Sequence, residues 1–322
     1  MKLRNGTHVD RVVDINPIAK SAMSVMVTYL MYGSEADLSS AQHNASSPLL
    51  RLPLEVKNLI YRSTFGDNLV HIIQNSDKGT ATFKNTICRA SISEEEAQEN
   101  FDGESTHQWY APANEGRHDC CRFQKGATFL DREEGPKVLS LSLLRCCRQI
   151  YNEAHHIPHA TNTFSCNDPE TLQKFVVSLA QGSNDNHLAV RSLFLEMVYE
   201  TTFENSWGRA VSTGAKLLKG LQNISIDVDW CAWHFCLGPR NQAELRKEGT
   251  SWSNNVISHV LALKKLPLKT ATMVISDQGT EEQHIGTTSP YWKNHEAEYR
   301  WTLDEKKEWA RYAREALLEP KI

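Results

Sequence analysis

The clearest pattern in the chain is a series of amphipathic helical stretches that are each followed by an apolar run of strand-like composition. Within each helical stretch, apolar residues recur at spacings of three and four. The three helix–strand pairs are residues 169–181 with 190–198, residues 207–219 with 223–230, and residues 253–265 with 270–276. Strands that alternate with helices pair in parallel through right-handed crossovers, so the pattern predicts an α/β fold.

The spacing of these units is uneven, which favours a loose leucine-rich-repeat-like layout over a regular solenoid. Other elements precede and follow the units. They are a hairpin of strands Leu69–Ile73 and Ala81–Arg89, a helix over residues 141–157 that ends at Pro158, a short strand Asn162–Cys166, and a closing helix over residues 303–318. The closing helix begins with a capping box, Thr302 to Glu305.

A short helix is also predicted within residues 49–66. Pro53 suits its first position, where the missing N–H costs nothing, and Gly66 suits a left-handed stop. Four positions follow the helical spacing i, i+3, i+4, i+7, namely Val56, Leu59, Ile60 and Ser63. The helix should therefore be amphipathic.

Two segments lack such periodicity. Residues 1–48 end in a small, polar stretch and predict a disordered arm and linker. Residues 91–136 contain three consecutive glutamates and several Gly and Pro residues, and they predict a long loop insertion. The folded domain is accordingly expected to span residues 49–322.

Charge and hydropathy narrow the classes of partner. The 322 residues carry a formal net charge of −4, so nucleic acid is a poor default partner. The longest apolar stretch, Met23–Tyr32, is about half the length that a membrane-spanning helix needs. The eight cysteines form no Cys-x-x-Cys pair and predict reduced thiols in an intracellular protein, cytoplasmic or nuclear.

Two sequence blocks carry a family resemblance. Residues 49–61 read LLRLPLEVKNLIY, and residues 143–154 read LLRCCRQIYNEA. In this order and about 90 residues apart, they resemble the F-box-like domain family of fungal proteins. The resemblance implies an F-box-like N-terminal helix that docks on a Skp1-type adaptor of a ubiquitin ligase. The adaptor-binding residues would be Leu52, Pro53, Val56, Leu59 and Ile60.

The chain departs from the F-box pattern after Phe65, where strand-like residues replace the second and third helices. The alternative interpretation is that the same apolar side chains pack the helix onto the domain core, because burial also requires an apolar stripe.

Several groups of residues could bind a metal or take part in catalysis, but ordinary packing or solvent exposure also explains each of them. Cys–His grouping is typical of zinc sites, and it occurs twice, as His118/Cys120/Cys121 with Cys146/Cys147 and as Cys231/His234/Cys236. We interpret both groups instead as packed side chains, because a free cysteine behaves as a small hydrophobic residue. His155, His156 and His159 are interpreted as a solvated helix end.

Asp227 and Asp229 would share one face of a strand, where two carboxylates could serve acid–base chemistry or hold a cation. A strand with one polar face explains them as well. No cofactor is predicted. The sequence therefore favours a non-catalytic protein-interaction module, with the role of an adaptor that recruits partners. The alternative is a metal-binding protein or hydrolase-type enzyme using Asp227/Asp229 or Cys231/His234/Cys236.

Overall fold

The computed structural model describes residues 47–75, 82–90, 92–103, 118, 121, 137–182, 185–199, 204–230, 259–277 and 303–319. The strands are β1 (Leu69–Asn75), β2 (Thr82–Ile87), β3 (Thr163–Cys166), β4 (Ser192–Tyr199), β5 (Asn223–Trp230) and β6 (Thr270–Asp277). The helices are α3 (Leu54–Phe65), α4 (Glu94–Asp102), η2 (Ser142–Arg145), α6 (Arg148–Ala154), α7 (Ile157–Thr161), α8 (Pro169–Gln181), α9 (Asn186–Ala189), α10 (Glu204–Leu217), η4 (Ala262–Lys265) and α15 (Leu303–Leu318).

The six strands form one sheet in the order β2-β1-β3-β4-β5-β6. The predicted hairpin is confirmed, since β1 and β2 pair antiparallel with Val70 opposite Ile87. Every other neighbouring pair is parallel, as the alternation of helices and strands predicts. Neighbouring strands in the parallel part follow one another in the chain, apart from the hairpin strand β2.

One face of the sheet is an apolar layer. The register aligns Leu193 of β4 with Ile224 of β5 and Leu195 with Ile226, and all four side chains are buried. Helix α8 covers this layer, because the rings of Phe164 and Phe175 lie 5.3 Å apart. Helix α8 begins as predicted, with the Asp168 side chain accepting the Thr171 N–H at 2.8 Å.

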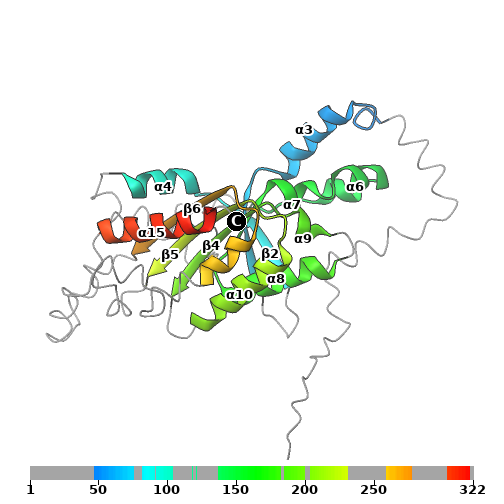
Figure 1. Ribbon diagram of the computed structural model, residues 1–322. Coiled ribbons are helices and arrows are strands. Elements are labelled where there is room, and N and C mark those ends of the chain that lie inside the picture. The colour runs from blue at the N-terminus through cyan, green and yellow to red at the C-terminus, as the bar shows by residue number, and fades with distance from the viewer. Residues whose placement is uncertain are drawn as a thin grey trace, which may run out of the picture.

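The opposite face is covered as well. Figure 1 shows α4 and α15 together on the other side of the sheet from α8 and α10. Trp309 and Ala310 of α15 are fully buried, and Arg314 binds Asp102 of α4 at 2.9 Å. The α/β class is confirmed. Within the described residues helices lie on both sides of the sheet, so the leucine-rich-repeat-like layout is not confirmed.

The prediction of a structureless loop over residues 91–136 is wrong at its start. The three glutamates open α4, whose N-cap Ser93 accepts the Glu96 N–H at 3.1 Å. Ala97 and Phe101 anchor the helix in the core. Its Gln98 side chain accepts the N–H of Met273 at 2.6 Å, which satisfies a donor on the outermost strand β6. Acidic residues suit the first turn of a helix because of its dipole.

The helix predicted over residues 141–157 is divided into η2, α6 and α7. Pro158 does not end a helix. It lies in the first turn of α7, where a proline has no N–H bond to lose. Gly66 is not left-handed either, because its backbone is extended and Asp67 takes the positive φ of 58°.

The strands at residues 162–166, 190–198, 223–230 and 270–276, and the helices at 207–219 and 303–318, are confirmed with small shifts of their ends. Only the last turns of the helix predicted at 253–265 fall in the described residues, where they form η4. Most of the arm predicted at 1–48 lies outside the described residues. No helix of the described part is long and apolar enough to span a bilayer.

A second, smaller core lies beneath α3. It consists of six buried residues, Tyr61, Phe65, Leu144, Ile150, Ala154 and Ile157. His159 of α7 lies nearby, 5% exposed, with its ring 6.0 Å from that of Phe164. It is therefore not part of a solvated helix end. Burial and the neighbouring charges of His155 and His156 lower the pKa of His159 to about 4.

The low pKa of His159 should make the protein less stable in mild acid. As the pH falls below 6.5, His159 binds a proton in the unfolded state but stays neutral in the folded state. The free energy of unfolding therefore falls until the pH reaches about 4, where the folded state also binds the proton. This group contributes a loss of about 3 kcal/mol across that window. In His159→Leu that loss should disappear. Urea unfolding of both proteins at pH 7 and pH 5 checks this, and equal losses of stability would contradict it.

Candidate docking site on helix α3

Helix α3 presents an apolar face to solvent. Leu59 is 69% exposed, Leu54 51% and Val56 40%. Of the other predicted adaptor-binding residues, Pro53 is exposed, whereas Leu52 and Ile60 are half-buried. Val56, Leu59 and Ile60 lie on one side of the helix, as their spacing predicts. The interpretation that this stripe packs the helix onto the core is therefore wrong.

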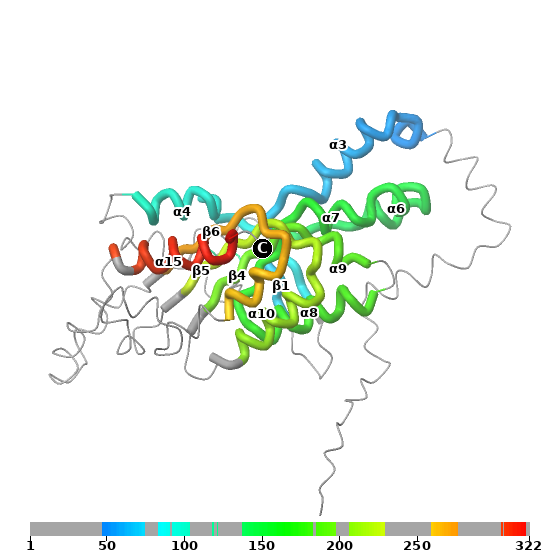
Figure 2. Tube along the Cα trace, viewed as in Figure 1, coloured from blue at the N-terminus to red at the C-terminus, as the bar shows by residue number. Residues whose placement is uncertain are grey.

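The opposite side of α3 faces the protein. Its buried residues are Lys57, Tyr61 and Phe65, which are four residues apart and so lie one above another. Tyr61 and Phe65 are fully buried, with parallel rings 6.2 Å apart. Figure 2 shows α3 extending away from the sheet near α6 and α7. The helix therefore has two apolar sides, and only one of them is needed for the fold.

A buried ion pair fixes the inner side of α3. Lys57 is 5% exposed, and its Nζ lies 2.6 Å from Oε1 of Glu153 on α6. The hydroxyl of Tyr61 donates to Oε2 of the same carboxylate at 3.0 Å. Burial and this bond raise the pKa of Tyr61 to about 12. Partial burial alone would raise the pKa of Glu153, but the hydrogen bonds from Lys57, Gln149 and Tyr61 outweigh it and lower the pKa.

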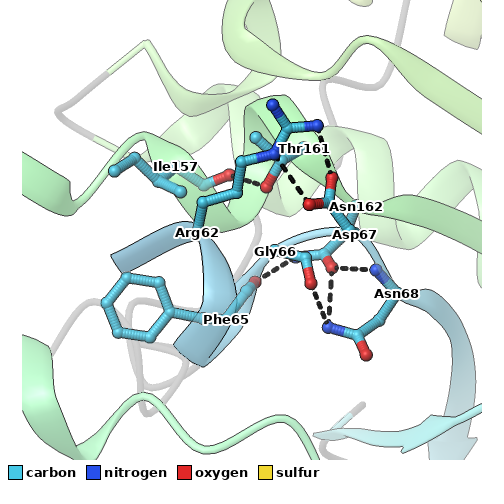
Figure 3. A network of polar contacts seen from close by, with 8 residues as sticks. All are labelled: Arg62, Phe65, Gly66, Asp67, Asn68, Ile157, Thr161 and Asn162. Carbon is cyan, nitrogen blue, oxygen red and sulfur yellow. Dashed lines mark hydrogen bonds and ion pairs between the residues drawn. The ribbon is translucent and has the colours of Figure 1, made fainter. Parts of the chain in front are cut away.

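The C-terminal end of α3 is held by a polar junction with α7, which Figure 3 shows from close by. The Asn162 side chain, fully buried, donates to the carbonyl oxygens of Phe65 at 2.5 Å and of Pro158 at 2.7 Å. Its own oxygen accepts the backbone N–H of Asn68 at 2.9 Å. One amide thus joins the end of α3 to α7 and to the start of β1.

Two further features complete this junction. Arg62 forms a double hydrogen bond with Asp67, at 2.7 and 2.8 Å, across the turn. A side chain at Gly66 would collide with the hydroxyl of Thr161 and approach the Arg62 carbonyl oxygen to 2.8 Å. The glycine is therefore required for close approach between α3 and α7, and not for a left-handed backbone.

The structure separates most of the other predicted groups. Cys146 and Cys147 lie between η2 and α6, away from His118 and Cys121, which instead lie with His71 and Cys88. Cys120 and the group Cys231/His234/Cys236 lie outside the described residues. The spacing His118-x-x-Cys121 was visible in the sequence, but nothing local indicated that His71 and Cys88 join it.

The acidic pair on β5 is only partly described. Asp227 is 7% exposed and lies in register with Glu196 of β4. The side chain of Asp229 is outside the described part of the chain. Asp227 therefore lies on the sheet face opposite to the apolar layer, as alternation predicts.

Taken together, the fold and the site define an α/β protein that carries a helix held by polar contacts, with one apolar face exposed among the described residues. The chain belongs to the family whose model is described as "Domain of unknown function (DUF7730)", which matches residues 41–229. This region includes α3 and extends almost to the end of β5. Comparisons with curated proteins and with solved structures gave no match.

Removing Glu153 should destabilise the protein because Lys57 would be left buried without a counter-charge. We expect Glu153→Leu to lower the free energy of unfolding by about 3 kcal/mol. The double variant Lys57→Met/Glu153→Leu should recover most of that loss, because a buried pair can be replaced by apolar side chains at little cost. Urea denaturation of the two single variants and the double variant completes the cycle. Additive losses would show that the pair is not coupled.

Proposed function

We propose that the protein is a non-catalytic interaction module and that the outer face of α3 is its docking element. The observation that supports this is the exposure of Val56 and Leu59 on a helix whose opposite side is already packed. Because residues 49–61 resemble an F-box helix, we propose a Skp1-type adaptor as the partner. Such a partner would meet the protein in the cytoplasm or the nucleus.

The geometry fits a helix that binds in a groove. In that mode, apolar anchors at i, i+3 and i+4 enter the partner, as Val56, Leu59 and Ile60 would. Burying an aliphatic side chain stabilises a complex by about 1.5–3 kcal/mol. The exposed polar residue Glu55 would lie at the rim of the interface.

The fixed position of α3 also favours binding. The Lys57–Glu153 pair and the Asn162 junction hold α3 in position before a partner arrives. A preformed helix loses little conformational entropy on binding, so more of the contact energy appears as affinity. This support also explains how the helix keeps apolar residues in water without collapsing onto the domain.

The test is titration of the purified full chain with a purified Skp1-type adaptor by isothermal calorimetry. We expect Leu59→Asp to weaken binding at least tenfold, because a charge would enter the apolar contact. The matched control is Asn58→Asp, which places the same charge on the same helix at an exposed position about 100° away. The control should bind as the unchanged protein does.

Circular dichroism and urea unfolding should show that both variants stay folded, since both positions are exposed. If the unchanged protein does not bind the adaptor, or if folded Leu59→Asp binds equally well, the proposed partner is wrong.

A further inference from the structure

Four side chains with soft or borderline donor atoms converge on one face of the sheet. They are His71 in β1, Cys88 just after β2, and His118 and Cys121, which are more than 25 residues further along the chain. His71 and His118 are each 2% exposed and Cys121 is 6% exposed. Their rings and sulfurs lie over the central strands, with the His118 ring 5.0 Å from both His71 and Phe194.

Two of the distances between the donor atoms match those of a tetrahedral zinc site. Sγ of Cys88 and Sγ of Cys121 are 3.9 Å apart, and two sulfurs bound to one tetrahedral Zn²⁺ are about 3.8 Å apart. Sγ of Cys88 lies 3.4 Å from Nδ1 of His118, where a zinc site requires about 3.5 Å. One donor atom each of His71, Cys88 and Cys121 lies within 4.8 Å of the others.

Each imidazole is oriented by a contact on its far nitrogen. Nδ1 of His71 lies 3.0 Å from the Ser165 hydroxyl, which directs its Nε2 toward the cysteines. Nε2 of His118 lies 3.2 Å from a carboxylate oxygen of Glu94, which directs its Nδ1 toward Cys88. Metal-binding histidines characteristically have such a partner, which fixes the tautomer and the ring.

The sulfur atoms have contacts that suit thiolates. The backbone N–H of Arg89 donates to Sγ of Cys121 at 3.1 Å. The backbone N–H of Ala90 donates to Sγ of Cys88 at 3.3 Å. These donors stabilise negative charge on sulfur, but the hydrogen bond of Cys121 to Cys88 and its burial raise the pKa of the Cys121 thiol in the metal-free protein. Zinc binds the thiolate form of cysteine, so metal binding would displace that proton.

We propose that His71, Cys88 and Cys121 bind one Zn²⁺ and that His118, whose Nδ1 already lies against Cys88, turns toward the metal as the fourth ligand. Two thiolates and two imidazoles are a typical ligand set for zinc, and four protein ligands leave no position for a substrate. The site is therefore structural. Its role is to fasten the segment that contains His118 and Cys121 to the β1–β2 hairpin and the sheet. This inference does not depend on the proposed adaptor binding.

The test is metal analysis of the full chain, purified under reducing conditions without a histidine tag. We expect about one zinc ion per chain by inductively coupled plasma mass spectrometry. After exchange for Co²⁺, the protein should show the strong visible bands of tetrahedral cobalt together with sulfur-to-cobalt charge transfer. A strong chelator should lower the melting temperature by several degrees, because zinc binds only the folded state.

Cys121→Ser should lose the zinc, whereas the matched control Cys146→Ser should keep it, because Cys146 is exposed and lies outside the cluster. Retention of stoichiometric zinc in Cys121→Ser would overturn this ligand set. The cobalt spectrum of the unchanged protein keeps the test decisive if the variant fails to fold. Absence of cobalt–thiolate charge transfer, or an intact mass that shows a Cys88–Cys121 disulfide in the reduced preparation, would overturn the site.

Discussion

The arrangement of the whole molecule depends on the buried amide of Asn162. This one side chain satisfies the carbonyl oxygens of Phe65 and Pro158 and the N–H of Asn68, which belong to three different segments. The next residue, Thr163, begins β3 in register with Leu69 of β1. The same amide therefore determines where α3 leaves the domain and how the first parallel strands align. An apolar residue of similar size would remove these hydrogen bonds to three backbone groups.

This constraint explains how α3 can leave one of its two apolar sides exposed. Its position does not depend on burying its apolar stripe, because hydrogen bonds at its end and the Lys57–Glu153 pair hold it. Tyr61 and Phe65 supply the packing that the small second core needs. The exposed side chains of Val56 and Leu59 are therefore not needed to hold the helix in place. A solvent-facing apolar stripe on a firmly held helix is an arrangement that natural surfaces generally avoid unless it binds something.

The elements with strong periodicity could be predicted from the sequence. Helix α8, with its Asp168 cap, and strand β5, with its alternation, follow local rules. The predictions that were wrong concern features that depend on contacts between residues far apart in the sequence. The stripe on α3 was found, but its direction was not, because the inward position of Lys57 depends on Glu153, 96 residues later. Helix α4 was not predicted because its first turn consists of three glutamates, which suggested a loop. His71 and Cys88 approach Cys121 only because the hairpin and the sheet bring them together.

The region that defines the family is shorter than the unit that folds. The family model ends at residue 229, within β5, yet β5 pairs along its whole length with β6. The side chains of Met273, Val274 and Ile275 on β6 are buried, and α15 covers this end of the sheet with Trp309. A fragment cut at the family boundary would present the backbone of β5 as an unprotected edge beside bare apolar surface. It would tend to aggregate, so β6 and α15 protect this edge of the sheet beyond the family boundary.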